Sequence, residues 1–136
     1  MAVLYNAEGG LIRALEVSDL TVTNTAAANT ACTLTIPAAG VGIFHYITSL
    51  VICRTATAAL TGSATLVITS TNLPGSWAHS VGNVMVAGGT QMDLNLQLTG
   101  NPLKSSVANT NTTIVCPAPG AAVLWRITAT YYAKAA

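Results

Sequence analysis

Hydrophobic and polar positions alternate along this chain in short runs, and Gly, Pro and Asn separate the runs from one another. β-Branched residues dominate these runs, which is typical of strands at the spacing found in sandwiches and barrels. The predicted strands are Ala31–Ile36, Ile43–Arg54, Ala64–Ser70, Val81–Val86, Gln91–Leu98, Thr112–Val115 and Ala122–Tyr132. We therefore expect an all-β chain, folded as an antiparallel β-sandwich of seven or eight strands.

Two of these strands indicate which side chains they bury. Successive side chains of a strand point to opposite faces of the sheet. In both strands every second residue is apolar, so one face of each strand is apolar throughout. The pattern predicts that Gln91–Leu98 buries Met92, Leu94, Leu96 and Leu98, and that the last strand buries Val123, Trp125, Ile127 and Ala129.

The segment before residue 30 lacks such a pattern. Leu11–Leu20 fits either a helix face or a strand, of which we favour the strand. Asn24–Thr30 is small and uncharged, as a linker would be. We expect an N-terminal arm and linker over residues 1–29 and one β-sandwich domain over residues 30–136, without an internal repeat.

The chain is unusually poor in charge. Nine of its 136 residues, 7%, are charged, whereas about 25% is usual for a soluble domain. Low charge is expected where surface is buried between subunits, so self-assembly is the first hypothesis; a soluble domain coated with Thr and Asn is the alternative. Arg54 is the only charge between Thr21 and Met92. The arm carries Glu8, Arg13, Glu16 and Asp19, and we expect it to lie across a neighbouring subunit.

Other bulk properties exclude several classes of partner. The net charge of +1 and the lack of a basic cluster argue against nucleic acid and anionic lipid. No apolar run reaches the 18 or so residues of a membrane span, and the N-terminus does not resemble a secretion signal. We expect synthesis in a reducing cytoplasm, where Cys32, Cys53 and Cys116 are free thiols rather than disulfide partners.

The titratable residues form no recognisable catalytic pattern. The only histidines are His45 and His79, and neither has a spacing to the few acids that suits a metal site or an acid–base pair. We expect no enzymatic activity, no cofactor and no metal. His45 lies between Phe44 and Tyr46 in a strand, and a half-buried histidine bonded to a neighbour is favoured over a ligand.

Aromatic residues are the candidates for contacts with a partner, because they are frequent among binding hot spots. Trp77 and His79 lie in a predicted loop and could contact a partner or a sugar ring; plain solvent exposure is the alternative for His79. Tyr131 and Tyr132 are adjacent in a strand and so face opposite sides, and we expect one of them to meet solvent or a neighbouring molecule. Trp125 is assigned to the core. The candidate interface residues are Trp77, His79, Tyr131, Tyr132, Arg13 and Glu16.

Three segments resemble small virion proteins of tailed bacteriophages: Tyr46–Thr55 (YITSLVICRT), Leu66–Gly75 (LVITSTNLPG) and Pro119–Arg126 (PGAAVLWR). The resemblance implies a jelly-roll-like sandwich, made in the host cytoplasm, that decorates or cements the phage head. It further implies a homo-oligomer, often a trimer, with the major capsid protein as partner. The resemblance supplies no functional residues. The alternative is a glycan- or receptor-binding module of a tail or head appendage, in which Trp77 or an exposed tyrosine stacks on a sugar.

Overall fold

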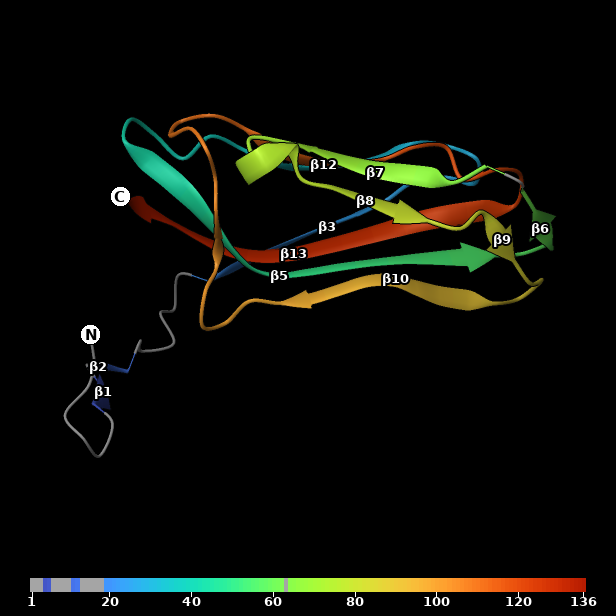
Figure 1. Cartoon of the computed structure of the whole chain (residues 1–136), viewed down its shortest axis with the longest axis horizontal. Coiled ribbons are helices and arrows are strands. Elements are labelled where there is room, and N and C mark those ends of the chain that lie inside the picture. The colour runs from blue at the N-terminus through green and yellow to red at the C-terminus, as the bar shows by residue number, and fades with distance from the viewer. Residues whose placement is uncertain (1–3, 6–10, 13–18, 63) are drawn as a thin grey trace.

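The computed structural model describes residues 4–5, 11–12, 19–62 and 64–136, and it has two packed antiparallel sheets (Figure 1). The β5 sheet has the order β10 (Thr90–Gln97), β5 (Ile43–Ala56), β13 (Val123–Ala135) and β3 (Leu20–Thr25), and β11 (Leu103–Lys104) pairs with the start of β5. The β12 sheet has the order β4 (Cys32–Ile36), β12 (Thr112–Cys116), β7 (Leu66–Thr71) and β8 (Ala78–Val81). The predicted all-β antiparallel sandwich is confirmed.

Smaller elements lie outside these two sheets. They are the pair β1 (Leu4–Tyr5) and β2 (Leu11–Ile12), the pair β6 (Leu60–Thr61) and β9 (Val84–Met85), and the 3-10 turn η1 (Pro74–Ser76). In the part of the chain that the structure describes, no helix is long and apolar enough to cross a membrane.

The core lies between the two sheets and follows from strict alternation along their strands. In β4 the buried residues are Cys32, Leu34 and Ile36, whereas the threonines between them are exposed. The inner face of β13 is formed by Val123, Trp125, Ile127 and Ala129, all fully buried as predicted. Burying an aliphatic side chain stabilises the fold by about 1.5–3 kcal/mol, so these facing rows hold the sheets together.

Residues 20–25 were expected in the arm, but the structure places them in the sandwich. β3 pairs with β13 over six residues, from Leu20 opposite Tyr131 to Thr25 opposite Arg126. The side chain of Val22 packs against the core. The pattern was hard to recognise because β3 is an edge strand in which five of six residues are exposed. The expected strand within Leu11–Leu20 falls mostly on residues outside the described part of the chain.

The alternation predicted for Gln91–Leu98 is wrong at its first residue. A register shift in β10 between Met92 and Leu94 turns the Asp93 side chain inward, and Met92 is 60% exposed. Leu94 and Leu96 pack against the core as predicted, whereas Leu98 lies beyond the strand. Such a bulge re-aims one side chain, and Asp93 is needed inside because the inner face of β5 carries Arg54.

The predicted strand Val81–Val86 is two strands, β8 and β9, on either side of a turn at Gly82 and Asn83. The carbonyl of Gly82 accepts a hydrogen bond from Arg54 at 2.8 Å, which fixes the turn against the other sheet.

The chain contains an internal repeat, contrary to our expectation. Residues 29–50 correspond to residues 109–130 at an offset of 80, and both segments share Asn-Thr, Pro-Ala-x-Gly and Ile-Thr at equivalent places. Asn29 and Asn109 have positive φ values of 57° and 50°, and Gly40 and Gly120 have φ values of 117° and 108°. The shared residues are widely separated within each segment, which is why the sequence pattern hid the repeat.

The two segments are related by a pseudo-two-fold axis. Leu34 pairs with its own equivalent, Ile114, and the register on either side of this pair is symmetric. The amide of Asn29 donates to Val123 O, and the amide of Asn109 donates to Ile43 O, each at 2.9 Å. Each Asn-Thr turn is therefore bonded to the start of the other segment's long strand, and the equivalent loops occupy opposite ends of the sandwich (Figure 1).

Candidate interaction surfaces

The candidate tyrosines are both buried, so the expectation that one of them meets solvent is wrong, whereas contact with a neighbouring molecule stays a prediction. Tyr131 is 6% exposed and lies edge-on to His45 with 5.8 Å between ring centroids. Tyr132 is 7% exposed and stacks on Tyr46 at 5.0 Å. The ammonium group of Lys134 lies 5.9 Å from the Tyr132 ring. Tyr46 and Lys134 thus cover the ring of Tyr132. Neither tyrosine offers a free surface.

Trp77 and His79 lie together, but not in an exposed loop. His79 belongs to β8, and its ring stacks on Trp77 with 6.5 Å between centroids. His79 Nε2 lies 3.1 Å from Asp93 O, and since a carbonyl oxygen only accepts, Nε2 donates this bond. Trp77 is half-buried against the core. The two remaining candidates, Arg13 and Glu16, lie outside the described residues.

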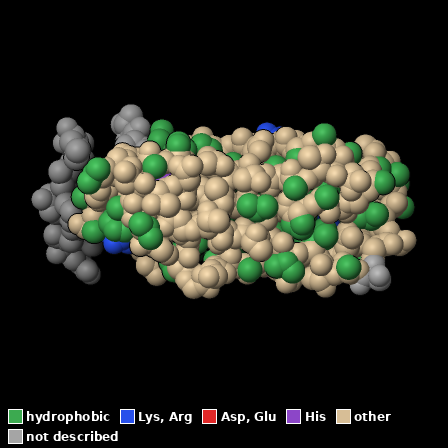
Figure 2. All heavy atoms as spheres, turned by 90° about the horizontal axis from the view of Figure 1, so that it is seen from above, with side chains coloured by type: hydrophobic (Ala, Val, Ile, Leu, Met, Phe, Trp, Pro, Cys, Tyr) green, Lys and Arg blue, Asp and Glu red, His purple; other side chains and the backbone are tan. Residues whose placement is uncertain are grey.

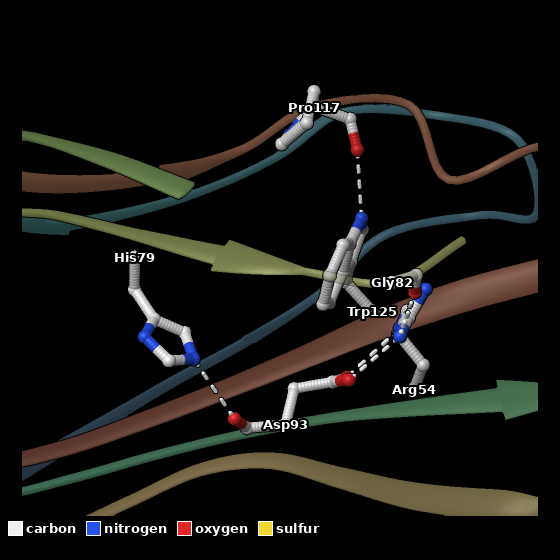
Figure 3. A network of polar contacts seen from close by, with 6 residues as sticks. All are labelled: Arg54, His79, Gly82, Asp93, Pro117 and Trp125. Atoms are coloured by element: carbon white, nitrogen blue, oxygen red, sulfur yellow. Dashed lines mark hydrogen bonds and ion pairs between the residues drawn. The ribbon is translucent and has the colours of Figure 1, made fainter. Parts of the chain in front are cut away.

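A buried ion pair lies between the neighbouring strands β5 and β10 and belongs to a network of polar contacts that reaches the other sheet (Figure 3). Arg54 Nε and Nη2 donate to the two carboxylate oxygens of Asp93 at 2.8 and 2.7 Å, and both side chains are fully buried. The guanidinium carbon also lies 5.0 Å from the centroid of the Trp125 ring. The Trp125 indole in turn donates to Pro117 O at 2.7 Å. This network joins β5, β10 and β13 to loops of the opposite sheet.

This network was not predicted from the sequence, although the sequence contains a signal for it. Arg54 is the single charge within a long uncharged stretch, and it alternates in β5 with the buried residues Leu50, Ile52 and Ala56. A buried charge must be paired, because leaving it unpaired costs several kcal/mol. Asp93 is the next charged residue along the chain, but the alternation in Gln91–Leu98 placed it on the polar face, opposite the buried leucines.

His45 is a structural residue, as expected, and is only 1% exposed. Its Nε2 donates to Pro37 O at 3.0 Å, so Nδ1 accepts the bond at 2.8 Å from the hydroxyl of Thr112. Trp125 occupies the equivalent place in the second repeat and donates to the equivalent Pro117. Burial lowers the pKa of His45, and the bond to Pro37 opposes this shift. The neutral ring therefore fills a site built for one donor and one acceptor.

The lowered pKa of His45 predicts a loss of stability in mild acid. The unfolded chain takes up a proton near pH 6.5, whereas the folded chain resists it, so the free energy of unfolding should be highest above this pH. It should decrease as the pH falls below about 6.5, down to the lowered pKa of the folded state. Urea titrations between pH 7.5 and 4.5 measure the slope of the free energy of unfolding against pH.

Two variants identify the residue responsible for the slope. His79→Gln should retain it, because His45 still titrates. His45→Gln should be less stable at neutral pH but should lose most of the slope. An unchanged slope in His45→Gln would contradict the assignment.

The three cysteines are free thiols, as predicted. Cys32 and Cys116 are buried and face each other across β4 and β12. Burial raises the pKa of the Cys116 thiol to about 12, and it also raises the pKa of Cys32. Cys53 is half-buried on the other sheet, and burial raises its pKa as well. Thiols held in the protonated form are poor nucleophiles, and Cys32 and Cys116 act as small core side chains.

Among the residues that the structure describes, no group of three or more His, Cys, Asp or Glu side chains is placed to hold a metal ion.

The outer face of the β12 sheet is broad and uncharged. Its side chains are Thr33, Thr35, Val67, Thr69, Thr71, Ala78, Ser80, Thr113 and Val115. Figure 2 views the molecule from this side, where hydrophobic and uncharged polar groups prevail and no Asp or Glu side chain is visible. The hydroxyls of Thr71 and Thr113 bond each other at 2.7 Å. These two threonines thus satisfy one another, and the face as a whole presents small uncharged side chains.

A second uncharged surface lies at one end of the sandwich, beside the β9–β10 connection. Val84, Val86 and Met92 are 59%, 73% and 60% exposed. They border an open groove of about 500 Å³ that residues 84–86 and 89–92 line. Clustered exposed apolar side chains often mark a contact site.

Comparisons of the chain with models of protein families, with curated proteins and with solved structures found no match.

Proposed function

We propose that this chain is a structural virion subunit of a tailed bacteriophage, which associates with copies of itself and binds the outside of the head as a decoration or cement protein. The observation that carries this proposal is the near absence of charge from the surface of the sandwich. Of the charged residues in the described part of the chain, Arg54 and Asp93 are buried against each other. The others are Asp19, Lys104, Arg126 and Lys134.

The distribution of these charges supports broad contact surfaces. Lys104 lies over the Phe44 ring at 4.0 Å and Lys134 over the Tyr46 ring at 5.4 Å, so both lie near the start of β5. The outer face of the β12 sheet carries no charged side chain among its described residues, and the groove beside the β9–β10 connection carries none either. Removing charged groups from water is far more costly than removing hydroxyl or aliphatic groups. Such surfaces suit permanent contacts to a capsid shell.

The order of the strands supports the jelly-roll part of the proposal. The eight main strands in chain order are β3, β4, β5, β7, β8, β10, β12 and β13. The first lies beside the last and the third beside the sixth in one sheet, while the second lies beside the seventh and the fourth beside the fifth in the other. A jelly roll of two Greek keys is nested in this way.

Cosedimentation with capsids tests the proposed function. A cement protein bridges neighbouring subunits, so it should sediment with assembled heads and show little affinity for isolated major capsid protein. The probe is the cognate major capsid protein in both forms, with bovine serum albumin as the control for trapping. Equal binding to shells and monomers would contradict bridging, and binding to neither would contradict the function.

The alternative proposal, a glycan-binding appendage module, receives less support from the side chains. Stacking on a sugar needs an exposed ring, and the large hydrophobic side chains that are exposed in the described residues are all aliphatic. Trp77 is half-buried against the core and its ring faces His79. A glycan array is the direct test, and a specific binder whose binding is lost in Trp77→Ala would favour this alternative.

A further inference from the structure

The edge strand β3 lacks the features that normally prevent edge strands from pairing with other chains. Natural edges are short, carry a charge or Pro, or contain a bulge. β3 has six residues, LTVTNT, without charge or Pro. Its register with β13 runs through all six pairs without a shift. In the described part of the chain, its opposite side has no partner strand. β3 therefore offers a regular row of backbone groups for pairing.

The other edges of the sandwich are blocked in different ways. β10 carries the bulge at Asp93, and β8 has only four residues. β4 is uncharged, but the side chain of Asn24 reaches across from β3 and donates to Thr33 O at 2.6 Å. This bond occupies a carbonyl on the free side of β4. β3 is thus the most open edge among the described strands.

The hydrogen bonds of β3 show which residues face outward. The amide of Ala26 donates to Trp125 O at 3.2 Å, so even-numbered residues direct their backbone groups to β13. Thr21, Thr23 and Thr25 therefore direct their N–H and C=O groups away from the sheet. The hydroxyls of Thr21 and Thr23 bond those of Thr130 and Thr128 at 3.2 and 3.0 Å. The outward backbone groups are separate from this ladder and stay available.

We propose that β3 pairs antiparallel with β3 of a second copy around a two-fold axis at Thr23, which joins the two β5 sheets into one continuous sheet. In this register Thr23 faces Thr23 of the second copy, and Thr21 faces Thr25 of it. Each such pair exchanges two backbone hydrogen bonds, giving roughly six. This is the only register that pairs all three outward threonines in both copies.

The chemistry of the edge favours a second copy over a different protein. Two uncharged strands meet without like-charge repulsion, and the threonine contacts already made with β13 are repeated across the new pair. The nearest charge, Asp19, would face Ala27 of the second copy and would lie a full strand length from the other Asp19. The inference does not rest on the proposed function, because the pairing requires no capsid. It differs from the trimer that the resemblance implies.

Complementary charges at Thr23 test the pairing. Thr23→Lys and Thr23→Asp each place like charges face to face on the two-fold axis, so each variant alone should dissociate at least ten times more readily than the parent chain. An equimolar mixture should form a Lys–Asp heterodimer and regain the mass of a dimer. Light scattering and native mass spectrometry of the full chain measure the species present.

The controls separate edge pairing from a general effect of charge. Thr69→Lys adds the same charge to an exposed threonine of the β12 sheet and should leave the dimer intact. Recovery in the mixture also shows that both variants are folded. A monomeric parent chain, a trimer, or an oligomer that Thr23→Lys leaves unchanged would each overturn the inference. Cosedimentation with heads is scored separately, since a monomeric Thr23→Lys chain can still bind a shell.

Discussion

Replacing Asp93 by alanine is expected to lower the free energy of unfolding by about 3–5 kcal/mol. The carboxylate accepts two hydrogen bonds from Arg54, and both side chains are fully buried. Without Asp93, the guanidinium group would remain in the core with only Gly82 O and the Trp125 ring as partners. Urea denaturation followed by tryptophan fluorescence measures the loss.

A double variant distinguishes the ion pair from simple loss of packing. In Arg54→Met with Asp93→Leu both charges are replaced by apolar groups, so no charge is left unpaired and the loss should be smaller than in either single alanine variant. Arg126→Ala on the exposed face of β13 is the matched control and should change stability by no more than about 0.5 kcal/mol. Arg54→Met and Asp93→Leu made singly complete the cycle, and a loss in the double variant equal to the sum of these two losses would show that the side chains act independently.

The parts of the fold that could be predicted are those in which one face of a strand is fully buried. Val123, Trp125, Ile127 and Ala129 line the core as their alternation indicated, because burial on a two-residue period leaves a direct trace in the residue types. β3 left little trace, since its residues are nearly all exposed. An edge strand obtains its position from backbone pairing, which any uncharged sequence can make.

The features that sequence reasoning missed depend on contacts between distant residues. Asp93 turns inward because Arg54, 39 residues away, needs a carboxylate, and this demand overrides the period-two pattern of β10. Tyr132 is covered because β13 extends far enough to place it opposite Tyr46. Neither outcome follows from the local residues, because each depends on which strands become neighbours. The candidate interface was therefore predicted less well than the core.

The internal repeat explains why the two ends of the molecule resemble each other in backbone but differ in chemistry. Equivalent positions hold His45 in one segment and Trp125 in the other, and each ring donates to the carbonyl of an equivalent proline. The hydrogen bond from the ring to the proline carbonyl is thus present in both segments, although the ring that donates it differs. The histidine site is bonded to Thr112 and faces Tyr131, whereas the tryptophan site covers the guanidinium of Arg54.

Replacing Trp125 by alanine is expected to cost about 3–5 kcal/mol, the usual range for a fully buried tryptophan. The side chain is completely buried, and its removal would leave a cavity, an unpaired Pro117 carbonyl and an uncovered Arg54. Trp125→Phe keeps most of the volume and the ring face but removes the indole donor, so it should cost about 1–3 kcal/mol. Chemical denaturation monitored by circular dichroism measures both variants, because it does not depend on the tryptophan signal.

Trp77→Ala is the control for Trp125→Ala. Because Trp77 is only half-buried, its replacement should lower the free energy of unfolding by less. The slope of stability below pH 6.5 should survive in Trp125→Phe, because His45 belongs to the other repeat. If Trp125→Phe were as damaging as Trp125→Ala, the hydrogen bond to Pro117 rather than the packing against Arg54 would dominate at this position. If both cost less than about 1 kcal/mol, the buried network would not be what joins the two sheets.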